Sequence, residues 1–104
     1  MKFIKTDTDV NLFENIIETE SQVVTHLVIP AGKDVPEHSV DYDVIVVPIK
    51  GKAIFGDVAE KREEVVVPGD IVQLHPNEHH YLKAIEDTEV MVIKSKLTEA
   101  FNHY

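Results

Sequence analysis

Short runs of valine and isoleucine, separated by turn residues, recur along this chain and constrain its fold more than any other feature. β-branched residues favour strands, whereas glycine, proline and aspartate favour turns. The pattern predicts an all-β sandwich or barrel, with strands over residues 22–29, 43–49, 52–57, 63–67, 70–74, 80–85 and 89–94. We expect Gly51 and Gly69 to adopt positive φ in the turns between strands.

Composition limits the class of protein. The chain has 104 residues, a length typical of a single domain, and no cysteine, so disulfides and thiolate metal sites are excluded. Ten basic and nineteen acidic residues give a net charge of −9, which disfavours nucleic acid and anionic membranes as partners. No apolar run is long enough for a signal peptide or a membrane span. We therefore expect a cytoplasmic protein with no nucleic-acid or membrane partner.

Two segments in the central half of the chain combine glycine and histidine at defined spacings. The first contains Gly32, His38 and Gly51, and the second opens with Gly69-Asp70 and closes with His80, eleven residues after the glycine. These segments resemble the two sequence motifs of the cupin superfamily. The resemblance implies a single cupin-like domain over residues 1–104, folded as a double-stranded β-helix, which is a jelly-roll barrel.

The same resemblance implies a metal site of three histidines and a glutamate inside the barrel, but only His38 and His80 occupy those positions. Val40 stands where the family has its second histidine, and Val44 where it has the glutamate. Zinc sites generally use at least three protein ligands, so two imidazoles would hold a metal weakly. We interpret the site as a degenerate metal site, with His75 as the best substitute ligand and His26 or a carboxylate as further alternatives.

Val40 and Val44 also predict the character of the pocket, because they add apolar surface where a metal would lie. We predict a small-molecule-binding or accessory module with no tightly bound metal, and with ligand contacts from His38, His80, Val40, Val44 and His75; this pocket should favour apolar over anionic ligands. The alternative is a divalent-metal-dependent enzyme, oxygenase- or isomerase-like. Iron, manganese, nickel or zinc would then bind a reduced shell centred on the two histidines. A metal-free isomerase or lyase with one histidine as general base is a third reading.

The remaining patterns concern assembly and the chain ends. Residues 44–49 are apolar at every position, so both faces of that strand should be covered, and the resemblance favours a homodimer over intramolecular cover. Residues 12–17 have apolar spacing compatible with a helix, but we favour an extended segment, as is common in cupin-like chains. The spacing of apolar residues in 97–104 predicts a short amphipathic C-terminal helix.

Overall fold

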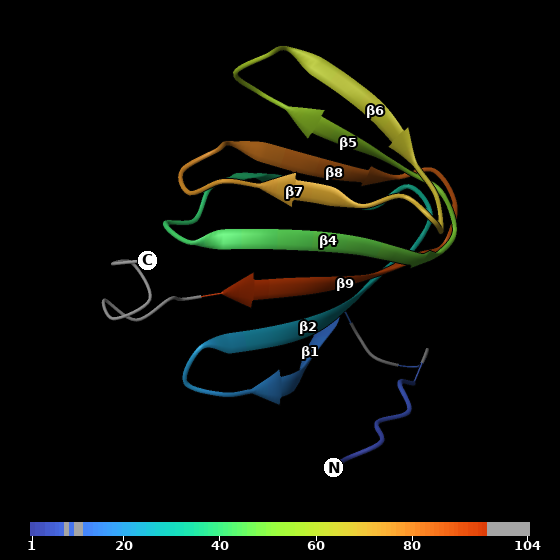
Figure 1. Cartoon of the computed structure of the whole chain (residues 1–104). Coiled ribbons are helices and arrows are strands. Elements are labelled where there is room, and N and C mark those ends of the chain that lie inside the picture. The colour runs from blue at the N-terminus through green and yellow to red at the C-terminus, as the bar shows by residue number, and fades with distance from the viewer. Residues whose placement is uncertain (8, 10–11, 96–104) are drawn as a thin grey trace.

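The computed structural model describes residues 1–7, 9 and 12–95, and the elements within them are β-strands (Figure 1). The strands are β1 (Phe13–Glu18), β2 (Gln22–Ile29), β3 (Asp34–His38), β4 (Asp43–Lys50), β5 (Ala53–Asp57), β6 (Arg62–Val66), β7 (Val72–Leu74), β8 (His80–Ala84) and β9 (Thr88–Ser95). The described residues contain no helix able to cross a membrane. The all-β prediction is confirmed, whereas the helix predicted over 97–104 lies outside the described residues.

The strands form two antiparallel sheets. The larger sheet has the order β1-β2-β9-β4-β7, and the smaller has the order β3-β8-β5-β6. The chain crosses repeatedly from one sheet to the other, so neighbouring strands are often distant in sequence. For example, β2 pairs with β9 along its whole length, from Gln22 opposite Ser95 to Ile29 opposite Thr88 (Figure 1).

The hydrophobic core lies between the two sheets and draws side chains from both. The larger sheet contributes Ile29, Val44, Val46, Leu74 and Val90, and the smaller contributes Ala53, Phe55, Val66, Leu82 and Ala84. Burying one large apolar side chain contributes about 1.5–3 kcal/mol, so these contacts hold the sheets together. Alternation along each strand then sends every second side chain to the opposite, outward face.

Two β-bulges explain where the strand predictions were incomplete. The expected extended segment at 12–17 is present as β1, but a register shift between Asn15 and Ile17 interrupts its alternation, which is why its apolar residues imitate helical spacing. β3 was absent from the predicted strands, and its register also shifts, between Val35 and His38. A bulged strand containing a proline has no regular period for sequence analysis to detect.

The turns follow the sequence signals closely. Gly51 and Gly69 have φ of 86° and 105°, so the prediction of positive φ is confirmed. A Cβ at Gly51 would lie 2.2 Å from the backbone oxygen of Asp87, so both backbone conformation and space require glycine there. Strand β7 begins at Val72 and not at residue 70, because the Asp70 carboxylate accepts a hydrogen bond from the Val67 amide at 2.9 Å and closes a turn.

Candidate functional site

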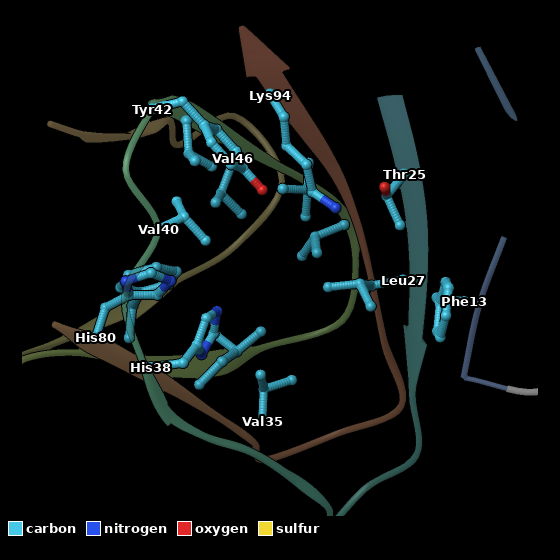
Figure 2. A pocket seen from close by; sticks show the side chains of 15 residues that line it. Phe13, Thr25, Leu27, Val35, His38, Val40, Tyr42, Val46, His80 and Lys94 are labelled. Carbon is cyan, nitrogen blue, oxygen red and sulfur yellow. The ribbon is translucent and has the colours of Figure 1, made fainter. Parts of the chain in front are cut away.

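A cavity of about 250 Å³ lies between the two sheets, and we call it the barrel cavity (Figure 2). It is smaller than the roughly 300–1,000 Å³ typical of pockets for drug-sized ligands. Most of its wall is apolar, and only a few of the side chains that line it carry a nitrogen or oxygen atom. The lining residues are Phe13, Thr25, Leu27, Val35, His38, Val40, Tyr42, Val44, Val46, Phe55, His80, Leu82, Val90, Val92 and Lys94.

The two histidines of the motifs meet in this cavity. His38 ends β3 and lies directly opposite His80, the first residue of β8. The bulge in β3 matters here, because Val35 and His38 are three residues apart and would otherwise point to opposite faces. The ring centroids of the two histidines are 4.2 Å apart, and the Phe55 ring stacks on His80 with a centroid distance of 5.7 Å.

Backbone carbonyls orient both imidazole rings in the same way. Nδ1 of His38 lies 2.9 Å from the carbonyl oxygen of Pro36, and Nδ1 of His80 lies 2.9 Å from that of Glu78. A carbonyl only accepts, so each Nδ1 carries the proton and donates it. In the neutral form each Nε2 therefore keeps a lone pair, able to accept a hydrogen bond or bind a metal.

Burial lowers the pKa of His80 below its ordinary value of 6.5, and the nearby His38 lowers it further, against the opposing hydrogen bond to the Glu78 carbonyl. A desolvated imidazole beside a second imidazole resists gaining a positive charge. At neutral pH His80 is thus a neutral hydrogen-bond acceptor facing an apolar cavity.

Val40 and Val44 complete the comparison with a metal site. Both line the barrel cavity, and Val44 is only 4% exposed. Among the described residues, no group of three or more histidines or carboxylates is placed to hold a metal ion. The side chains present therefore do not fit the metal centre of three histidines and a glutamate implied by the motif resemblance: two donors face the cavity, and valines stand at the other two positions.

The remaining histidines of the described residues lie away from the cavity. His75 follows β7, is exposed, and does not line the cavity. His79 is exposed, with its ring 3.2 Å from the Glu37 carboxylate. His26 alternates with Thr25 and Leu27 and faces outward, where it is fully buried, with Nε2 2.8 Å from the Glu89 carboxylate. The ligand contact predicted for His75 therefore has no support from its position.

The structure adds three polar groups that the sequence analysis did not place in the cavity, Thr25, Tyr42 and Lys94. A usable signal was present for Lys94, because Val90, Val92 and Lys94 alternate along one face of β9. A lysine that continues an apolar alternation is either at the end of the buried face or aimed into a cavity. In Figure 2 its ammonium nitrogen and the Tyr42 hydroxyl both point inward, and the histidines occupy another side of the cavity.

Comparisons with known proteins identify solved structures with the same fold. No protein-family model matches the sequence, and no curated protein matches it significantly. Among solved structures, the chain is similar to an RmlC-like cupin family protein with a double-stranded β-helix fold from Methanocaldococcus jannaschii, with a TM-score of 0.80, 23% identity and coverage of 98% of this chain and 96% of that one. It is also similar to KdgF from Halomonas sp., with a TM-score of 0.75, 18% identity and coverage of 86% and 82%.

A third similar structure is the DMSP lyase DddQ from Ruegeria pomeroyi, with a TM-score of 0.70 and 21% identity. The alignment covers 78% of this chain but 41% of the lyase. Identities this low show a shared fold, and one fold supports many unrelated functions.

Proposed function

We propose, for a chain that has the double-stranded β-helix fold of cupins, that it is a cytoplasmic small-molecule-binding or accessory module, a single domain over residues 1–104, with no tightly bound metal. One observation carries the proposal: a single apolar cavity holds the side chains of His38 and His80, each with Nδ1 bonded to a carbonyl and Nε2 left as an acceptor. Apolar walls with a few convergent polar groups are the usual form of a small-molecule site.

The chemistry of the lining favours binding over metal catalysis. Val40 and Val44 occupy the positions of two ligands, so a divalent ion would have two protein donors and an apolar wall around it. A ligand that offers hydroxyl or N–H donors would satisfy both Nε2 atoms without a metal. The metal-dependent enzyme of the sequence analysis, with iron, manganese, nickel or zinc, is the competing reading that experiment must test.

The first experiment is elemental analysis of untagged protein, purified without chelator and then loaded separately with manganese, iron, nickel and zinc salts. We expect far less than one metal per chain in each case and a melting temperature unchanged by chelator. About one metal per chain, lost in both His38→Ala and His80→Ala but kept in the exposed control His75→Ala, would overturn the proposal in favour of the metal-dependent enzyme.

We also propose that the protein is a homodimer, formed through the outer face of the larger sheet. The apolar residues of this outer face are Ile17, Val24, Val28, Ile45, Val47, Ile49, Met91 and Ile93, all partly or well exposed, and the buried His26–Glu89 pair lies on the same face. Register supports a continuous apolar surface, because Ile45 lies opposite Ile93 and Val47 lies opposite Met91. A second copy of this face is the natural cover, since most of its exposed side chains on β4 and β9 are apolar and the His26–Glu89 pair on the same face is already buried.

Sedimentation at micromolar concentration tests the dimer. We expect dimer in the parent and monomer in Ile45→Lys, because a lysine placed in an apolar interface loses its hydration without a partner. The control is Val65→Lys, in which an exposed valine of the smaller sheet is replaced and the dimer should persist. A parent that is monomeric across this concentration range would exclude the dimer.

A further inference from the structure

Lys94 is the one lysine among the cavity-lining residues, and its environment is unusual for that side chain. It lies on β9 with Val44 directly opposite on β4 and Val23 opposite on β2. Its side chain is half-buried, and Figure 2 shows its nitrogen directed into the barrel cavity. A lysine stem packs well on apolar walls, but its ammonium group normally remains in bulk water.

Within the described residues Lys94 forms no ion pair with a carboxylate, although Glu20 lines a neighbouring hollow together with Lys94 and Tyr42. Other lysines of the described residues do have such partners: Lys50 lies 3.7 Å from Glu89, and Lys52 lies 3.9 Å from Glu86. Lys94 forms no such ion pair with the described part of the chain, although the protein carries nineteen acidic residues. An ammonium group that is partly desolvated by valines gains more from an anion than one exposed on the surface does.

Two hydroxyl-bearing side chains, Thr25 and Tyr42, also line the cavity. Thr25 is 3% exposed, and its hydroxyl donates to the Asn15 side-chain oxygen at 2.7 Å, so its one proton is already used within the protein. The Tyr42 hydroxyl points into the cavity (Figure 2). The histidines offer the opposite chemistry, because their Nε2 atoms accept hydrogen bonds.

From this arrangement we propose that the ligand of the barrel cavity is a small organic acid. Its carboxylate pairs with Lys94, its apolar body lies against the valines, and a hydroxyl or N–H group donates to Nε2 of His38 or His80. The assignment rests on the proposed small-molecule function and narrows it to a class. It differs from the expectation of a preference for apolar over anionic ligands, which rested on Val40 and Val44 alone; the experiment below decides between the two.

The test uses three probes of matched shape: 2-hydroxy-3-methylbutanoate, its neutral amide, and 3-methylbutane-1,2-diol. Binding is followed by the methyl NMR signals of Val90, Val92 and Leu82, which line the cavity. We expect the acid to bind about ten- to a hundredfold more tightly than the amide or the diol, because an interaction with a charged group has that effect on a dissociation constant.

Two variants separate the charge from the cavity. Lys94→Met removes the charge and keeps the volume, and we expect the acid then to bind no better than the amide, whose own affinity is unchanged. Lys83→Met, at an exposed position of β8, is the control and should keep the preference for the acid. Lys94→Gln serves the same purpose if the methionine variant does not fold.

The outcomes distinguish the two proposals. If the amide or diol binds as tightly as the acid, or if the preference for the acid survives in Lys94→Met, the organic-acid assignment is wrong while small-molecule binding stands. If none of the probes shifts the cavity signals at concentrations on the order of 10 mM, both the assignment and the proposed binding function are contradicted.

Discussion

Removal of one member of the buried pair His26–Glu89 should destabilise the protein far more than removal of both. His26 is fully buried on the outward side of β2, and its Nε2 donates to the Glu89 carboxylate at 2.8 Å. The Glu89 side chain is 7% exposed. In His26→Leu this carboxylate keeps only the Lys50 ammonium, 3.7 Å away. A buried charge that loses its close partner destabilises by about 3–5 kcal/mol, and the remaining lysine places the expected loss near the lower limit, at about 3 kcal/mol.

The double variant His26→Leu/Glu89→Leu leaves no buried charge, so we expect it to recover most of that loss, because apolar residues often replace a buried ion pair without net destabilisation. The assay is urea unfolding, supported by thermal melting, in which about 3 kcal/mol corresponds to a fall in Tm of roughly 12–24 °C for a domain of this size. Arg62→Gln breaks an exposed ion pair with Glu64 and serves as the control, with stability unchanged. The reasoning is refuted if His26→Leu stays within about 0.5 kcal/mol of the parent, or if the double variant is less stable than either single one.

Three further predictions follow from the described contacts. The Tyr81 ring lies directly over Gly56, where a Cβ would be 2.0 Å from the ring, so Gly56→Ala should lower the free energy of unfolding by about 1–3 kcal/mol in urea titration, and adding Tyr81→Ala should relieve the clash. Burial lowers the pKa of His80 in the folded protein, so His80 gains a proton more readily in the unfolded chain. The free energy of unfolding should therefore be highest above pH 6.5 and fall as the pH drops from 6.5 towards the folded pKa. This fall should be smaller in His80→Asn. NMR titration of the ring should show the low pKa directly. Val40→His/Val44→Glu restores the ligand types of the cupin motif, so elemental analysis should find about one divalent metal per chain; a double variant that folds but retains no metal would contradict the interpretation of these valines.

The candidate site was only partly readable in advance. The resemblance to the cupin motifs identified His38 and His80, and the structure places them across from each other in one cavity. His75 stood equally close to the second motif, yet it is exposed after β7 and outside the cavity lining. Proximity in sequence to a motif does not fix direction in space, because a turn between strands can send a side chain either way.

The strands, too, could be predicted only in part from the sequence. The segment Gln22–Ile29 was predicted with the bounds that β2 has, since it is rich in β-branched residues and contains no glycine or proline. β3 was missed, because Pro36 and a bulge remove the alternation that identifies a strand. Regular strands can therefore be predicted from the sequence pattern, whereas bulged strands cannot.

The sequence by itself determined an all-β chain and positive φ at two turn glycines, and its resemblance to the cupin motifs implied that Val40 and Val44 replace two metal ligands. The strands and turns follow from local backbone preferences and from the chemistry of single side chains. Only the tertiary structure decided that Lys94 shares a cavity with the histidines, and that His26 is buried against Glu89 on the opposite face. Alternation tells which residues of one strand share a face, but the pairing of strands distant in sequence decides which face encloses the cavity.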